Sequence, residues 1–97
     1  MKDKELLDKA AKAAGIYKWQ TRDSGVGFYW YPLKDDGDAL RLAVKLGFGF
    51  EIWKSRCWIW ALAERNEALA SEAVMDNPYA ATRRAIVIAA AAIGEQK

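Results

Sequence analysis

The closing segment, residues 77–94, constrains the fold of this chain more than any other stretch. After Arg84 it reads AIVIAAAAI, so apolar residues surround the expected helix on almost every side. A helix of this kind is buried on more than one side. Asn77 is a favoured N-cap residue, Pro78 suits the first helical position, and we expect Gly94 to end the helix. The segment therefore predicts a helix between layers, covered either by the opening helix of the same chain or by a second subunit.

The composition is that of a folded globular protein. Apolar residues make up 53% and charged residues 29% of the 97 residues, which predicts one domain spanning 1–97. The net charge of +2 is too small to indicate nucleic acid or an anionic membrane by itself. The single cysteine, Cys57, has no internal partner and fits a reducing compartment. Because the opening residues form a charged amphipathic pattern rather than a signal peptide, we expect a soluble, cytoplasmic protein with no membrane association.

Two further helices are expected. The first covers residues 4–14, with Asp3 as its N-cap and Gly15 as its left-handed end. The second lies within WYPLKDDGDALRLAVKLG, residues 30–47. There Asp35 or Asp36 provides the cap, Asp38 lies in the positive first turn, and Gly47 ends the helix. We expect its apolar face to consist of Leu40, Ala43, Val44 and Gly47, widened by Leu42 and Leu46.

The remaining segments predict strands. Residues 16–30 alternate around the turn residues Asp23, Ser24 and Gly25, which indicates a hairpin. Residues 48–53 and 57–62 alternate around a turn at Ser55 and are apolar on both faces, so we expect them to be covered at least partly on both sides. Residues 68–75 suit either helix or strand, and we predict the third strand of a meander. The fold class is therefore α+β: an antiparallel sheet of four to five strands with three helices packed on it, in the order αββαββ(β)α.

The chain carries no signature of catalysis. Without histidine, the usual general base and most transition-metal sites are missing. Cys57 is expected to be a packed apolar residue. The acids at 35, 36 and 38 suit helix capping better than calcium, because the position of the bidentate glutamate in a calcium loop starting at Asp35 is occupied by Leu46. We expect no catalytic, cofactor-binding or metal-binding residues and no enzyme activity; an enzyme built on paired carboxylates remains the alternative.

Arginine at the start of the closing helix raises a separate question. Arg83 and Arg84 lie one turn into the helix, where they could hold an anion near its N-terminus. We favour solvated surface charge for both.

Tryptophan is the one compositional excess, with five residues in the chain. Three of them alternate with basic residues in one hairpin, and we take this segment as the candidate binding site: Trp53, Lys54, Arg56, Trp58 and Trp60. Three interpretations remain open. The indoles could pack in the core under the helices, anchor a protein interface or self-association, or stack on single-stranded nucleic acid beside the cations. Glu51 and Glu64 on neighbouring strands weaken the nucleic-acid interpretation.

Three stretches resemble a group of small proteins encoded by tailed bacteriophages and prophages. They are ELLDKAAKAAG, the central WYPLKDDGDALRLAVKLG and the closing DNPYAATRRAIVIAAAAIGEQ. The resemblance is to the domain described as a phage α-β-α sandwich. It implies a phage origin and a fold type, and it provides no catalytic residue to transfer. The tryptophan-rich IWKSRCWIW is not part of the resemblance.

Together these observations predict a non-enzymatic phage accessory protein that binds a host protein. An anti-defence or host-takeover inhibitor, acting in the host cytoplasm, is the sharpest form of this hypothesis. The alternative is a nucleic-acid-binding or nucleotide-binding module that uses the same hairpin. A homodimer is compatible with both, because the apolar closing helix and a sheet edge could each be covered by a second copy.

Overall fold

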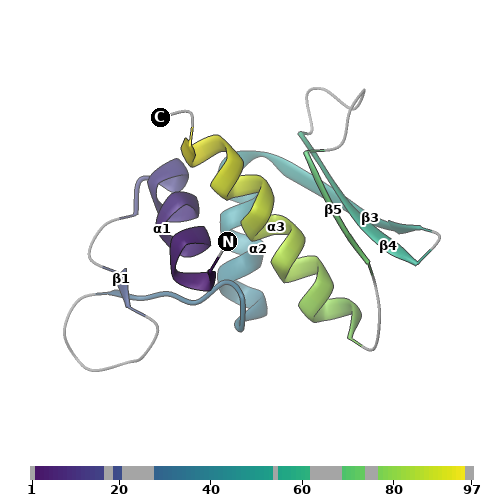
Figure 1. Ribbon diagram of the computed structural model, residues 1–97, viewed down its shortest axis with the longest axis horizontal. Coiled ribbons are helices and arrows are strands. Elements are labelled where there is room, and N and C mark those ends of the chain that lie inside the picture. The colour runs from purple at the N-terminus through teal and green to yellow at the C-terminus, as the bar shows by residue number, and fades with distance from the viewer. Residues whose placement is uncertain are drawn as a thin grey trace.

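The computed structural model of the chain describes residues 2–16, 19–20, 28–53, 55–61, 69–73 and 77–95. This part of the chain has an α+β fold with three helices and a three-stranded antiparallel sheet (Figure 1). The elements in chain order are α1 (Asp3–Ala14), β1 (Trp19–Gln20), β2 (Phe28–Tyr29), α2 (Asp36–Leu46), β3 (Phe48–Trp53), β4 (Arg56–Ala61), β5 (Ala70–Ala73) and α3 (Pro78–Glu95).

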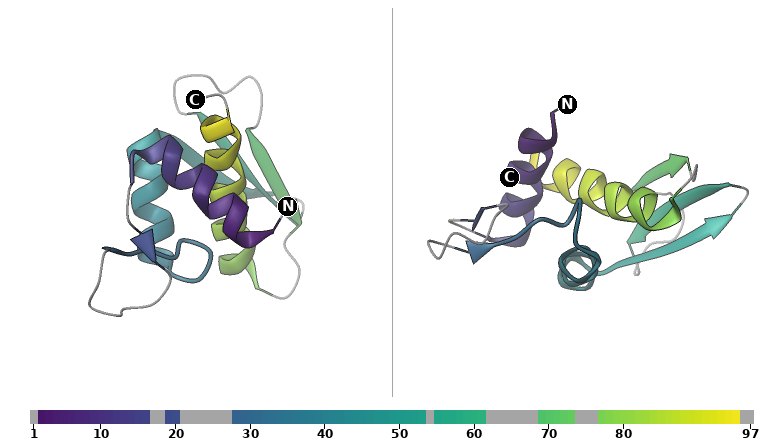
Figure 2. Two further views of the ribbon diagram at one scale, coloured as in Figure 1. Left: turned by 60° about the vertical axis from the view of Figure 1, so that its left-hand side comes forward. Right: turned by 90° about the horizontal axis from the view of Figure 1, so that it is seen from below.

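The closing helix α3 is the centre of the molecule, as its apolar sequence predicts. It contacts α1 and α2 on one side and strands β4 and β5 on the other (Figures 1 and 2). Asn77 caps it, because the Asn77 side-chain oxygen accepts hydrogen bonds from the backbone N–H groups of Tyr79 at 3.0 Å and Ala80 at 3.1 Å. Of the two coverings that the sequence left open, α1 of the same chain is the one that packs on α3.

Gly94 does not end α3, contrary to the sequence-based expectation. The helix continues through Gly94 to Glu95, and Gly94 is buried where α3 meets α1. A Cβ atom at Gly94 would overlap the backbone carbonyl oxygen of Lys9 and come within 2.7 Å of its carbonyl carbon. Position 94 therefore carries glycine because the two helix backbones approach each other there.

The opening helix α1 was predicted correctly except at its first residue. Lys2, not Asp3, occupies the N-cap position, and it makes no side-chain capping bond. Asp3 is instead the first helical residue and lies 3.4 Å from Nη1 of Arg84 on α3. Gly15 ends the helix in the left-handed conformation at φ 70°. The buried stripe that packs on α3 consists of Leu6, Leu7, Ala10, Ala11, Ala13 and Ala14.

In α2 the capping residues are confirmed, and the buried face is confirmed only for Leu42 and Ala43. Asp35 caps the helix by accepting from the N–H of Gly37 at 3.0 Å, and Gly47 ends it at φ 73°. Leu40 and Val44, expected in the core, are 54% and 71% exposed. The buried residues are Asp38, Ala39, Leu42 and Ala43.

The bonds of Asp38 account for this orientation of α2. Its carboxylate accepts from the backbone N–H of Tyr31 at 2.9 Å and from Nη2 of Arg41 at 2.6 Å. Since a buried carboxylate must be hydrogen-bonded, these contacts turn the Asp38 side of the helix inward and leave Leu40 on the surface.

The main sheet has the order β3-β4-β5 and is antiparallel throughout. Strand β5 confirms the prediction of a third meander strand within residues 68–75. Cys57 and Ile59 on the central strand β4 are fully buried toward α3. Among the described strands, β3 lies at an edge of the sheet. Its residues Phe50 and Ile52, on the side that faces α3, are about half-exposed, which agrees with the partial covering that the sequence predicted.

The sheet is smaller than the four to five strands that the sequence predicted. Strands β1 and β2 do not join it; they form a separate two-residue ladder in which Trp19 pairs with Phe28 and Gln20 with Tyr29. This ladder is parallel, so the expected hairpin is also wrong at this point. The turn proposed at Asp23, Ser24 and Gly25 lies outside the described residues. The sequence pattern does not distinguish the two directions of pairing, because side chains alternate between the two faces of a strand in parallel and antiparallel ladders alike.

Candidate functional site

Three of the five residues selected from the sequence come together on one face of the sheet. Arg56, Trp58 and Trp60 occupy alternate positions of β4, opposite in direction to the buried Cys57 and Ile59. Across the strands, Trp58 pairs with Glu51 on β3 and with Ser71 on β5. We call this side of the sheet the tryptophan face and define it by Glu51, Arg56, Trp58, Trp60 and Ser71.

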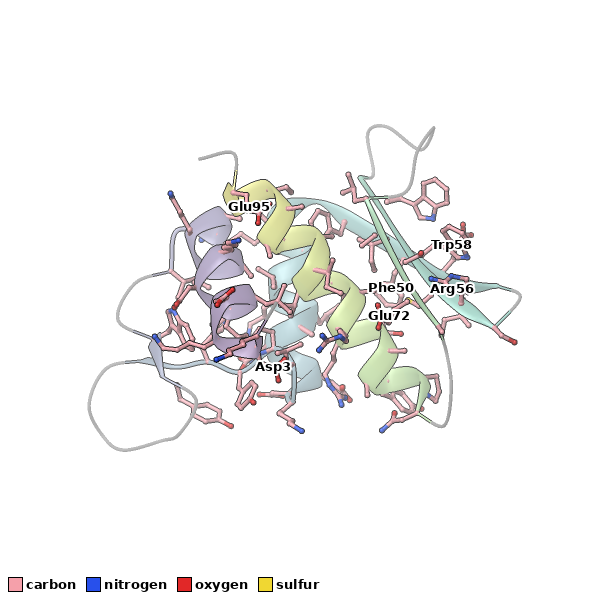
Figure 3. The ribbon with its side chains drawn as sticks, viewed as in Figure 1. Asp3, Phe50, Arg56, Trp58, Glu72 and Glu95 are labelled. Atoms are coloured by element: carbon pink, nitrogen blue, oxygen red, sulfur yellow. The ribbon has the colours of Figure 1, made fainter. Side chains whose placement is uncertain are left out.

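The tryptophan face points away from the helices. Figure 3 shows Arg56 and Trp58 projecting from the side of the sheet opposite α3, whereas Phe50 lies on the α3 side. Among the described elements, all three helices lie on the same side of the sheet (Figure 2). Trp58 and Trp60 are half-buried and Arg56 is exposed. The interpretation that these indoles pack in the core under the helices is therefore wrong for Trp58 and Trp60.

Contacts within the face hold Arg56 in place. Its Nη2 donates to Oγ of Ser71 at 3.1 Å, and its guanidinium carbon lies 6.0 Å from the centre of the Trp58 ring. That separation is at the outer limit of a cation–π contact. The indole nitrogen of Trp58 is buried, although the residue is only half-buried. The exposed part of Trp58 is therefore carbon, which suits apolar contact with a partner.

Of the other two predicted site residues, Trp53 is placed only in part and Lys54 is not described. The backbone of Trp53 pairs with Arg56 at the end of β3, but its side chain lies outside what the structure describes. Lys54 also lies outside the described residues. Ser55, in the turn next to it, has a positive φ of 63°, which agrees with the tight turn expected there.

The charge on the tryptophan face is mixed. Glu51 lies directly across from Trp58, and Arg56 is the neighbour of Trp58 on the same face of β4, two residues earlier in the sequence. An acidic side chain beside the central indole repels the phosphates of a nucleic-acid strand, so a mixed-charge protein surface is the better match to this face.

The other two tryptophans have a structural role. Trp30 is buried in the core, and the Trp19 and Trp30 rings lie 5.4 Å apart at 70°, an edge-to-face contact. Trp19 belongs to the β1–β2 ladder and Trp30 directly follows β2, so neither takes part in the tryptophan face.

The acidic cluster at 35–38 is divided among three structural contacts. Asp35 caps α2, Asp36 forms an ion pair with Arg83, and Asp38 binds Tyr31 and Arg41. Within the described ranges, no group of three or more His, Cys, Asp or Glu side chains is arranged to hold a metal ion.

Arg83 is not the solvated surface charge that the sequence suggested. Its side chain is largely buried, its Nε donates to the carbonyl oxygen of Leu33 at 3.0 Å, and its Nη1 pairs with Asp36. Arg84 lies nearer the surface, within 3.4 Å of Asp3 on α1 and 3.7 Å of Glu72 on β5. Both arginines therefore connect α3 to neighbouring elements.

Cys57 is a core residue, as expected. It is fully buried on the α3 side of β4. Burial raises the pKa of the Cys57 thiol, and a hydrogen bond with the Thr82 side chain offsets part of that rise. A thiol with a raised pKa carries little thiolate at neutral pH and is a poor nucleophile.

A second feature, an apolar groove on the α3 side of the sheet, was not predicted from the sequence. It has a volume of about 450 Å³ and is lined by residues of α2, β3 and α3, among them Leu40, Phe50, Ile52, Tyr79 and Ile86. Alternation placed Phe50 and Ile52 on the same face as Phe48, and the sequence predicted only that this face is covered at least in part. Only the position of β3 at the sheet edge leaves them exposed.

Within the described part of the chain, no helix has both the length and the apolar character needed to cross a membrane. Comparisons of the sequence with protein-family models and with curated proteins, and of the structure with solved structures, found no match.

Proposed function

We propose that this protein acts by binding another protein through the tryptophan face. The observation that supports this proposal is the alternation of Arg56, Trp58 and Trp60 along β4 on a side of the sheet that no described helix covers. Tryptophan and arginine are the residues most enriched among the energetic anchors of protein interfaces. The carbon surface of Trp58 and the mixed charge of Arg56 and Glu51 match the apolar centre and polar rim of such an interface.

The resemblance noted in the sequence extends the proposal to a particular partner class. A phage-encoded accessory protein that binds a host protein in stoichiometric amounts, as an anti-defence or host-takeover inhibitor does, needs a recognition surface and no catalytic group. The described part of the chain offers such a surface, and within it the one buried acid, Asp38, and the Cys57 thiol are both engaged in structural contacts.

The test compares affinity capture from a bacterial lysate by the wild-type chain and by two charge-reversal variants. Arg56→Glu changes the tryptophan face, and Lys4→Glu makes the same change at an exposed position on α1, away from that face. We expect Arg56→Glu to reduce capture of the specific partner by about tenfold or more, as the loss of an interface anchor does. Lys4→Glu should capture as the wild type does. Equal capture by all three proteins contradicts the proposal.

A fluorescence titration separates this proposal from nucleic-acid binding. We expect the tryptophan emission of the wild type to stay unchanged when single-stranded oligonucleotide is added at low salt. Quenching that disappears as salt is raised would favour stacking of bases on the tryptophan face instead.

A further inference from the structure

Exposed apolar side chains gather around one edge of the sheet, on the side away from the tryptophan face. Leu40 of α2, Phe50 and Ile52 of β3 and Tyr79 of α3 all line the apolar groove, and Phe50 and Ile52 are 48% and 52% exposed. Val44, one helical turn after Leu40, is also exposed. Monomeric proteins rarely leave large apolar side chains clustered in this way, so the rim of the groove has the character of an interface.

The same edge has unpaired backbone groups. Among the described residues β3 pairs with β4 alone, and we call its other side, which has no described strand neighbour, the free edge. Every second residue of an edge strand directs its N–H and C=O groups outward, where another strand can bind them. Helices cannot satisfy such a row of alternating donors and acceptors. The partner that fits is therefore an extended strand with apolar side chains on its groove-facing side.

We propose that this strand is β3 of a second copy of the chain, paired antiparallel about a two-fold axis. Such an interface is isologous, so each copy must provide both the free edge and the apolar surface, and β3 has both. The two three-stranded sheets would join into one continuous sheet. Phe50 and Ile52 of each copy would lie against the groove rim of the other.

The charge pattern of β3 allows this self-pairing in a particular register. With Phe50 opposite the partner's Phe50, Phe48 faces the partner's Ile52 on the groove side, and Gly49 faces the partner's Glu51 on the other side. A shift of the two-fold axis to Glu51 places two carboxylates opposite each other, which is unfavourable. The register centred on Phe50 pairs aromatic and aliphatic side chains and opposes no like charges.

The exposed face of α2 agrees with the same arrangement. Leu40 and Val44 are four residues apart and therefore share one side of the helix. Because Leu40 lines the groove together with Phe50 and Ile52, this side of α2 lies near the groove-facing side chains of β3. Pairing of the two β3 strands places both α2 helices on the same side of the joined sheet, where these leucines and valines can contact one another across the axis.

Sedimentation equilibrium on the full chain tests the dimer directly. The monomer mass is 10.9 kDa. We expect the wild type to move from one to two times that mass as its concentration rises through about 1–200 µM, the range in which a modest interface associates. Ile52→Lys, which places a charge at the edge, should weaken the association about tenfold or more.

Controls separate loss of the interface from loss of the fold. Leu40→Lys alters the same interface from α2 and should weaken it without altering any strand. Tyr29→Lys alters an exposed aromatic residue outside the groove and should associate as the wild type does. Circular dichroism and thermal unfolding establish that each variant is folded. Hydrogen exchange should show alternate β3 amides becoming protected as the concentration rises.

The proposal is overturned if the wild type stays at 10.9 kDa over the whole range, or if folded Ile52→Lys and Leu40→Lys proteins associate as the wild type does. A dimer whose protected amides lie elsewhere than in β3 also overturns it. None of these measurements involves a heterologous partner, so binding through the tryptophan face can fail or hold independently.

Discussion

Three neighbouring acids with similar sequence surroundings have three different structural environments. Asp35 and Asp36 are at least partly exposed, whereas Asp38 is only 4% exposed. The Asp38 carboxylate is stabilised there by the backbone N–H of Tyr31 and the guanidinium of Arg41. It joins the segment before α2 to the first turn of the helix, and this contact sets which side of α2 is buried.

Replacing Asp38 with alanine should lower the free energy of unfolding by about 1–3 kcal/mol. The reason is that the N–H of Tyr31 loses its acceptor in a position that water does not readily reach. Urea denaturation measures the effect. Asp8→Ala is the matched control, because Asp8 is an exposed acid whose ion pair with Lys4 at 3.7 Å contributes about 0–1 kcal/mol. If Asp38→Ala costs no more than Asp8→Ala, the structural role given to Asp38 is wrong.

Cys57 should make the stability of the protein depend on alkaline pH. Its pKa is raised in the folded state by burial, so the unfolded chain loses this proton first as the pH increases. The contribution of the protonated thiol to the free energy of unfolding is fully present below the ordinary thiol pKa of about 8.5. It is lost as the pH rises through the higher pKa that the thiol has in the folded protein.

The measurement is the difference in the free energy of unfolding between the wild type and Cys57→Ala. This difference should shrink as the pH is raised from about 7 to about 10, since only the wild type has the thiol. Lysine and tyrosine ionisation affects both proteins alike and cancels. A difference that stays constant over this range would show that the thiol ionises equally in the folded and unfolded states.

At the scale of elements, local sequence signals predicted helix ends better than strand pairing. Asn77, Asp35, Gly15 and Gly47 act as caps or ends where expected, because capping depends on residues within one turn. The direction of the β1–β2 ladder and the edge position of β3 depend on segments distant in sequence. Alternation along one strand does not specify either of them.

Gly94 shows how a local signal can be misleading. A glycine near the end of a helix resembles a stop, yet here it allows the backbones of α1 and α3 to approach. Gly94→Ala should lower the free energy of unfolding by about 1–3 kcal/mol, because the added methyl group forces the two helices apart.

The control for Gly94→Ala is Ala92→Gly, the reverse change at an exposed position of the same helix. Intrinsic helix propensity alone makes alanine better than glycine by about 1 kcal/mol, so Ala92→Gly should destabilise by about that amount. Urea denaturation gives both values. A Gly94→Ala protein that is more stable than the wild type would mean that propensity, not helix packing, governs position 94.

The whole molecule is organised around α3, with α1 and α2 on one side and the sheet on the other (Figure 1). This arrangement leaves the two sides of the sheet unequal. One side packs on α3 and opens into the apolar groove at the β3 edge, whereas the other carries the tryptophan face. The proposed dimer uses the edge and the groove, so it leaves both tryptophan faces available on one joined sheet.

The candidate site was therefore predictable in part. Alternation placed Arg56, Trp58 and Trp60 on one face, and the structure agrees. The sequence did not show whether that face would point toward the helices or away from them, because both strands of the β3–β4 hairpin carry apolar residues on both sides. The exposure of Phe50 and Ile52 could not be derived either, since it follows from the absence of a neighbouring described strand beyond β3.

The sequence by itself determined the helices, most of their caps and ends, the β3–β4 hairpin, the third strand and the central burial of α3. These follow from periodicity and capping chemistry, which act over a few residues. Tertiary structure alone decided the rotation of α2, the close contact at Gly94, the size of the sheet and which side of it the helices cover. Those properties depend on contacts between elements that are distant in the sequence. Because the strands are apolar on both faces, their sequence does not show which face the helices cover, and packing decides it.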